Sequence, residues 1–91
     1  MLPKQGNLAM RKYTREHTLI RAWAEERGGH PARVRGAGVL RIAFGPLPPN
    51  WEPLDWDAFF ATFAADGLAF LYEESAASRI CKLVKGHTVG E

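Results

Sequence analysis

Two stretches of the chain place apolar side chains at the spacing of an amphipathic α-helix. The first stretch sets four residues on one face, namely Ile20, Trp23, Ala24 and Arg27. Thr14 is the expected N-cap, with Thr18 as the alternative, because either hydroxyl can accept from a free amide of the first turn. Gly28 supplies a left-handed residue that ends the helix, and Pro31 prevents its resumption.

The second stretch carries the richest apolar stripe in the chain. Its members, at i, i+3, i+4 and i+7, are Trp56, Phe59, Phe60 and Phe63. Asp55 is a good N-cap, and Asp57 suits the positive end of the helix. Gly67 follows as a stop signal. The pattern predicts a helix over residues 56–65, with its aromatic face in the core.

Apolar and polar positions alternate in the segments that follow each helix. This period of two predicts four strands, at residues 32–36, 39–44, 68–73 and 79–84. Short turn segments join them pairwise, so each helix precedes a β-hairpin. The order α-β-β-α-β-β predicts an α+β fold, with two helices packed on an antiparallel sheet built from two hairpins. One four-stranded sheet is favoured over two separate hairpins, because an isolated hairpin is marginal in water.

The remaining segments define the domain boundaries. Residues 1–13 lack periodicity and are expected to be a flexible N-terminal arm, residues 14–85 a single domain, and residues 86–91 a flexible tail. Residues 45–53 hold four of the six prolines and are expected to form a stiff connection, neither helix nor central strand. In the two helix-hairpin units, Trp23 corresponds loosely to Trp56, and so do the glycines that end each helix, Gly28 and Gly67. We interpret this as recurring architecture at most.

Composition excludes several classes of protein. The chain is 46% hydrophobic, which is typical of a folded domain, and its single cysteine, Cys81, permits no intramolecular disulfide and no cysteine cluster for zinc. His17, His30 and His87 lack the spacing of metal ligands, and no phosphate-binding glycine motif occurs. We therefore expect no catalytic, cofactor or metal site, and no enzyme. The chain has no long apolar run and no signal-peptide pattern, so a cytoplasmic protein without a membrane partner is expected.

Charge is segregated along the sequence. Residues 1–41 hold nine Lys and Arg against three Asp and Glu, whereas residues 42–78 hold six acidic and no basic residues. If the basic segments meet in space, the domain has one basic and one acidic face. The candidate basic contact face comprises Arg33, Arg35, Arg41, Lys82 and Lys85. Guanidinium rows suit phosphate, but the alternative is an ordinary solvated face paired across strands with Glu73 and Glu74.

Trp51 is the candidate interface anchor. It lies in the proline-rich connection, away from both helical stripes, and a stiff loop that presents tryptophan is typical of a protein-binding surface. The alternative is that Trp51 folds back onto the core.

Several segments together resemble a family of small, uncharacterised bacterial proteins. The most specific is Arg21-Ala-Trp-Ala-Glu-Glu-Arg-Gly-Gly followed by Pro31-Ala-Arg-Val, and the others are Leu40-Arg-Ile-Ala-Phe-Gly, Trp56-Asp with Phe59-Phe60, Leu68-Ala-Phe-Leu-Tyr and Ser78-Arg-Ile-Cys-Lys-Leu-Val. The resemblance covers residues 14–84. The chain departs from the family pattern at Ala43 and Ala58, where acidic residues are usual.

Some members of that family carry the label 1,4-alpha-glucan branching enzyme. Retaining glycosyl transfer needs two carboxyl groups about 5–5.5 Å apart, one of them poised as an acid. The candidates here are helix-cap residues, Asp55 and Asp57, and a turn pair, Glu73 and Glu74. These residue types in these positions favour structural roles, so the sequence argues against the label.

The functional prediction is a small non-enzymatic protein that acts by contact with another protein. Binding of nucleic acid or phosphate by the arginine-rich face is the first alternative. A phage or mobile-element inhibitor, such as an anti-CRISPR, is the second. Homodimerisation through a strand edge remains open, because an open sheet leaves two edges.

Overall fold

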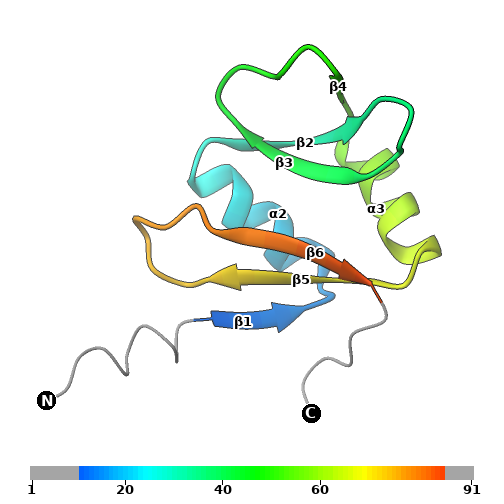
Figure 1. The fold of residues 1–91 in the computed structure, drawn as a ribbon. Helices are drawn as coiled ribbons and strands as arrows, with labels where there is room; N and C mark the ends of the chain where they lie inside the picture. Colours follow the sequence, from blue (N-terminus) through cyan, green and yellow to red (C-terminus); the bar gives the residue numbers. More distant parts are fainter. Residues whose placement is uncertain (1–10, 86–91) are drawn as a thin grey trace, which may run out of the picture.

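The computed structural model describes residues 11–85, so the predicted tail and residues 1–10 of the predicted arm lie outside the described residues. The elements are β1 (Arg11–Thr14), α2 (His17–Glu26), β2 (Gly29–Val34), β3 (Leu40–Phe44), β4 (Trp51–Pro53), α3 (Trp56–Ala65), β5 (Leu68–Glu73) and β6 (Cys81–Lys85) (Figure 1). Two helices and antiparallel strands confirm the predicted α+β fold.

The strands form two three-stranded antiparallel sheets, in the orders β1-β5-β6 and β3-β2-β4. The prediction of a single four-stranded sheet was therefore wrong. Each predicted hairpin instead gains a third strand from the other half of the chain. The strand β1, which precedes α2, pairs with β5, and β4, which precedes α3, pairs with β2. The third strand supplies the support that a lone hairpin lacks.

Both of these added strands correct the sequence prediction. Residues 11–13, expected in the arm, belong to β1, where Arg11 is the partner of Glu73. Residues 51–53, expected in a stiff connection, form β4 at the edge of its sheet. A strand of three residues that ends in Pro53 is tolerated there, because the outer side of an edge strand needs no N–H donor.

The exchanged strands complete an internal repeat that the sequence shows only faintly. Each half follows the order β-α-β-β, and the first residues of the helices, His17 and Trp56, are 39 positions apart, as are Gly28 and Gly67. Both glycines have positive φ, 74° and 63°. Trp23 and Trp56 do not correspond at this offset. The repeat is thus one of backbone geometry, with different side chains filling each half.

The helix boundaries agree with the sequence in one half and differ in the other. Helix α3 begins and ends as predicted, and Asp55 Oδ1 accepts a hydrogen bond from the Ala58 N–H at 2.7 Å. Helix α2 begins at His17, with Glu16 as an N-cap whose side chain makes no capping bond. The predicted cap, Thr14, lies in β1, where its hydroxyl oxygen accepts from the Glu16 N–H.

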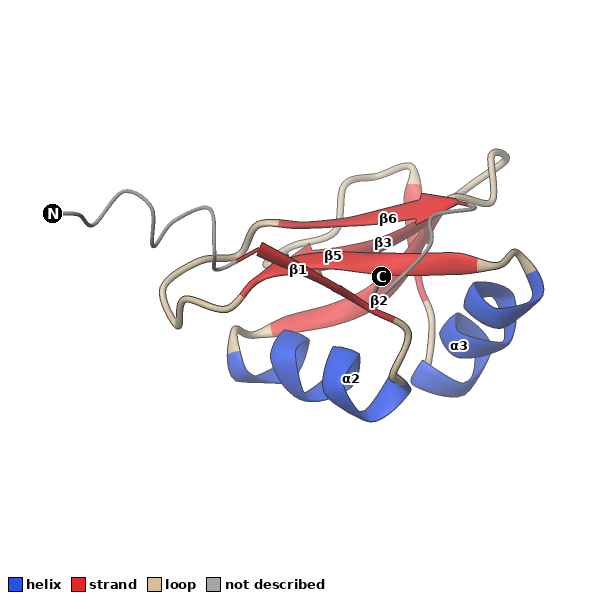
Figure 2. Cartoon of the chain, turned by 90° about the horizontal axis from the view of Figure 1, so that it is seen from below, coloured by secondary structure: helices blue, strands red, loops and turns tan. Residues whose placement is uncertain are grey.

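Both helices pack on the same side of the strands, as Figure 2 shows. The core lies between the two layers and comprises Ile20, Trp23, Ala24, Leu40, Ile42, Phe59, Phe63, Phe70 and Tyr72. This confirms the predicted core role of the aromatic stripe for Phe59 and Phe63, while Trp56 and Phe60 pack at its margin. Neither α2 nor α3 has the length and apolarity that crossing a membrane requires.

Candidate functional site

The side of the two sheets that faces away from α2 and α3, called here the helix-free face, is the one turned toward the viewer in Figure 1. Strand alternation and pairing assign residues to it. Leu40 and Ile42 belong to the core, so Arg41 lies on the opposite side. In the other sheet Phe70 and Tyr72 belong to the core, so Leu71 lies on the helix-free face, together with its partners Tyr13 and Lys82.

Large apolar side chains are exposed on this face. Among the residues that the structure describes, the exposed large hydrophobic side chains are Tyr13 at 38%, Val39 at 42% and Ile80 at 52%. Val39 and Ile80 each precede a strand by one residue, and their carbonyl oxygens accept bonds from Val34 and Glu73, which continues the ladders. Alternation then sets all three side chains on the helix-free face.

The two sheets meet edge to edge along β3 and β6, in what we call the seam. Cα atoms of these strands approach within 8 Å, although the strands belong to separate sheets. Arg79 lies 5.8 Å from the ring centroid of Phe44 at one end, and Leu40 shares a hollow with Leu83 at the other. The two strands therefore run in opposite directions.

The middle of the seam holds a pair of cations above an apolar floor. Arg41 and Lys82 line the same hollow, of about 270 Å³, with Ile42, Cys81 and Leu83. Both charged side chains are exposed. Among residues 11–85, neither has a carboxylate within ion-pair distance.

The five residues of the predicted basic face do not share one face. Arg33 is the cross-strand partner of Leu40, so it lies on the side opposite Arg41. Glu52 pairs with both Arg33 and Arg35, and accepts from Arg33 Nε at 2.6 Å. The structure thus brings Arg41 and Lys82 together and places Arg33 and Arg35 around a carboxylate.

Lys85 lies apart from the central pair. It is the partner of Leu68, on the core side of its strand, and lines a hollow with Asp66 at one end of the seam. Glu73 and Glu74 were expected to pair with the cations of the basic face, but their ion-pair partners are Arg11 and Lys12 of β1.

Folding interleaves the charge segments that the sequence keeps apart. Glu73 pairs with Arg11 at 2.9 Å, and Glu74 pairs with Lys12 at 3.1 Å, both across to β1. Together with the pairs made by Glu52, these contacts join acidic residues of segment 42–78 to basic residues of segment 1–41. In the middle of the seam Arg41 and Lys82 have no carboxylate partner among the described residues, and Arg79 at one end has none either.

Trp51 lies in β4, half-buried, and is outside the main core. It is the cross-strand partner of Val34 on the helix-free face. The Arg41 guanidinium lies 6.0 Å from its ring centroid, at the outer limit of a cation–π contact. The sequence offered two alternatives for Trp51, an interface anchor or a side chain folded onto the core. The structure matches neither fully, because Trp51 packs on the helix-free face of its sheet, outside the main core, and stays partly exposed.

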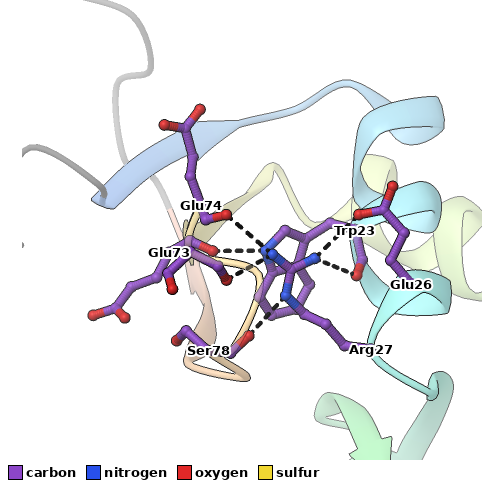
Figure 3. A network of polar contacts seen from close by, with 7 residues as sticks. Trp23, Glu26, Arg27, Glu73, Glu74 and Ser78 are labelled. Carbon is purple, nitrogen blue, oxygen red and sulfur yellow. Dashed lines mark hydrogen bonds and ion pairs between the residues drawn. The ribbon is translucent and has the colours of Figure 1, made fainter.

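A buried arginine at the end of α2 holds the loop between β5 and β6. The Arg27 guanidinium donates to four backbone carbonyl oxygens, at 2.7–3.2 Å, those of Trp23, Glu74, Ser75 and Ser78 (Figure 3). It also stacks 4.3 Å from the centroid of the Trp23 ring, whose N–H donates to the Glu73 carbonyl oxygen at 2.7 Å. This network fixes the loop that leads into Ile80 and β6.

Sequence reasoning missed this role of Arg27. It treated the residue as the aliphatic end of an apolar face, although the side chain is only 5% exposed. The available signal was the spacing of Trp23 and Arg27 at i, i+4, which allows the guanidinium to stack on the indole. All four acceptors are backbone carbonyl oxygens, and three of them lie about fifty residues away in sequence, so no residue type in the sequence predicts them.

The pKa shifts of Cys81, Tyr72 and Glu73 all move these groups away from reactivity. Burial raises the pKa of the Cys81 thiol to about 11, with Arg27 acting in the opposite direction, so the thiol stays protonated at neutral pH. Burial also raises the pKa of Tyr72. A hydrogen bond from Ser78, and then one from Arg11, lower the pKa of Glu73, which stays ionised. Within residues 11–85, no three His, Cys, Asp or Glu side chains gather as a metal site would require.

Comparison of the chain with family models, curated proteins and solved structures finds no match. The resemblance noted from the sequence segments stays a prediction, and the functional argument rests on the helix-free face itself.

Proposed function

We propose that this protein acts by binding another protein through its helix-free face. The observation that carries the proposal is that Tyr13, Val39 and Ile80 are exposed together on this face, while the helices bury the other. Several exposed aliphatic and aromatic side chains on the same face of a small domain favour a protein-binding surface there.

The rigidity of the face supports the same role. Arg27 anchors the loop before Ile80, and β1 and β4 each extend a hairpin to three strands. A preorganised surface loses little conformational entropy on binding, so more of the contact energy appears as affinity.

The directions of the pKa shifts also favour binding over catalysis. A general acid needs a carboxyl group with a raised pKa, and a nucleophilic cysteine needs a lowered one. Glu73 and Cys81 are shifted the other way. These groups therefore support a non-enzymatic role.

The test compares partner capture by three forms of the protein. Wild type, Val39→Asp/Ile80→Asp and a control, Ala22→Asp/Ala61→Asp, are immobilised and exposed to nuclease-treated lysate of the organism that encodes the chain. The control adds the same charge at exposed positions on the helices. We expect the wild type and the control to retain the same protein, and the face variant to lose about tenfold or more of it.

Folding of each form is checked by its melting temperature. All three should melt within a few degrees of one another, since the substituted side chains are exposed. If the face variant retained the same proteins in the same amounts as wild type, the helix-free face would not be the binding surface.

A second candidate function is binding of a phosphate backbone by the unpaired cations Arg41 and Lys82. Two phosphate contacts predict a log–log salt slope of only about −1.4 for single strands. Arg33 and Arg35 contribute little to this reading, because Glu52 already neutralises them. The phage-inhibitor reading stays a prediction of the sequence alone.

A further inference from the structure

The seam between β3 and β6 brings two like charges, those of Arg41 and Lys82, to one hollow without a carboxylate partner among the described residues. Arg41 and Lys82 line one hollow from two adjoining strands. Like charges that line one hollow repel each other, and this repulsion opposes the approach of the two sheet edges. An anion between them would relieve the repulsion, so the pair favours a bound state in which a negative group occupies the seam.

Several other cations of the described residues are neutralised by a carboxylate of the chain itself, and a bound anion would take that role at the seam. Arg11 and Lys12 each have a glutamate partner, and Glu52 serves both Arg33 and Arg35. In each case the fold itself provides the carboxylate. For Arg41 and Lys82, whose side chains are exposed, the described residues provide none.

The surroundings of the pair indicate what kind of anion fits. The floor of the hollow is Ile42, Leu83 and the neutral thiol of Cys81. Apolar walls lower the local dielectric constant and strengthen an ion pair formed above them. They also favour aliphatic groups beside the anion, which a phosphodiester backbone does not offer.

The flanking residues repeat across the seam with approximate two-fold symmetry. Val39 stands two residues before Arg41, and Ile80 stands two residues before Lys82, an offset of 41 positions in both cases. Because β3 and β6 run in opposite directions, the seam presents an aliphatic side chain at each end and the cations in the middle. This pattern matches an extended segment with a central acidic residue and aliphatic residues two positions away on either side.

We propose that the partner contributes such an acidic segment, with its carboxylate between Arg41 and Lys82 and its aliphatic side chains against Val39 and Ile80. This inference rests on the proposed function and names the chemistry of the partner. A nucleic acid is disfavoured, because exposed aliphatic side chains flank the two cations in the middle of the seam.

The probe is a fluorescein-labelled, N-acetylated peptide, Ser-Ile-Ser-Glu-Ser-Ile-Ser, followed by fluorescence anisotropy. The comparison probes are the same peptide with Gln in place of Glu, and a labelled ten-residue thymidine oligonucleotide. The proteins are wild type, Arg41→Gln/Lys82→Gln and a control, Lys12→Gln/Arg21→Gln, which removes equal charge from exposed ion pairs elsewhere.

The expected result is saturable binding of the Glu peptide to wild type and control. Affinity should fall about tenfold in Arg41→Gln/Lys82→Gln, and by a similar factor for the Gln peptide, since each change removes the ion pairs at the seam. The oligonucleotide should bind more weakly than the Glu peptide at physiological salt.

Three outcomes would overturn the inference. The first is no binding of the Glu peptide at millimolar protein, and the second is equal binding of the Glu and Gln peptides. The third is tighter binding of the oligonucleotide with the same dependence on Arg41 and Lys82, which would assign the seam to phosphate. The capture experiment with Val39→Asp/Ile80→Asp remains independent, so failure of the acidic-segment inference is distinguishable from failure of the proposed function.

Discussion

Replacement of Arg27 is the sharpest test of how the β5–β6 loop is held. The side chain is nearly buried, and its guanidinium serves four backbone carbonyl oxygens while stacking on Trp23. In Arg27→Ala the loop carbonyls regain water in part, so each lost bond costs about 0.5–1 kcal/mol rather than its full strength. Loss of the stacking contact adds about 1 kcal/mol. Together these losses come to at least about 3 kcal/mol.

Arg27→Lys separates charge from geometry. Lysine keeps the positive charge, but its ammonium is a compact group with three donors and lacks the planar fork that reaches several acceptors. We expect a cost of about 1.5 kcal/mol, roughly half that of the alanine variant. Arg21→Ala is the matched control, because Arg21 makes only an exposed pair with Glu25, and it should cost no more than about 0.5 kcal/mol.

The assay is urea unfolding followed by tryptophan fluorescence and circular dichroism. A loss of 3 kcal/mol corresponds to a fall in melting temperature of about 12–24 °C for a domain of this size. Hydrogen exchange of residues 74–80 should accelerate in Arg27→Ala before global unfolding does. A cost below about 1 kcal/mol for Arg27→Ala, or equal stability of wild type and Arg27→Lys, would refute the reasoning.

Three further outcomes are expected. Gly29→Ala should cost about 1–3 kcal/mol in urea unfolding, because a Cβ there would lie 2.7 Å from Cε1 of Phe44, and an unchanged midpoint would contradict this. Asp55→Ala should cost about 1 kcal/mol, whereas Glu16→Ala, which removes no capping bond, should cost nearly nothing; equal costs would exclude the capping explanation. Cys81 should resist iodoacetamide at pH 8 until urea unfolds the chain. Its raised pKa adds stability below about pH 9 that is lost as pH rises toward 11, so faster alkylation in the folded state would contradict the burial.

The sequence predicted the parts of the fold that depend on local chemistry. The helix over residues 56–65, its Asp55 cap and the stop at Gly67 were read correctly, because capping and left-handed glycine act within a few residues. The cap of α2 was read wrongly. Thr14 has the right side chain, but pairing of β1 with β5 draws it into a strand.

Prediction of the candidate site was partial for a related reason. The sequence singled out Arg41 and Lys82, yet it grouped them with Arg33 and Arg35. A shift of one residue in strand register moves a side chain to the other face, and register depends on the partner strand. Because Arg33 pairs opposite Leu40, its side chain lies on the other face of the sheet from Arg41.

The sequence by itself determined the class of the fold, the two helices, the two hairpins and the core role of Phe59 and Phe63, since periodicity and local stop signals suffice for these. Only the tertiary structure decided that β1 and β4 exchange between halves, that Arg27 ties the loop, and that Arg41 meets Lys82. Each of these joins residues tens of positions apart in sequence. Such contacts depend on which surfaces meet when the chain packs. The local chemistry of single residues does not determine which surfaces those are.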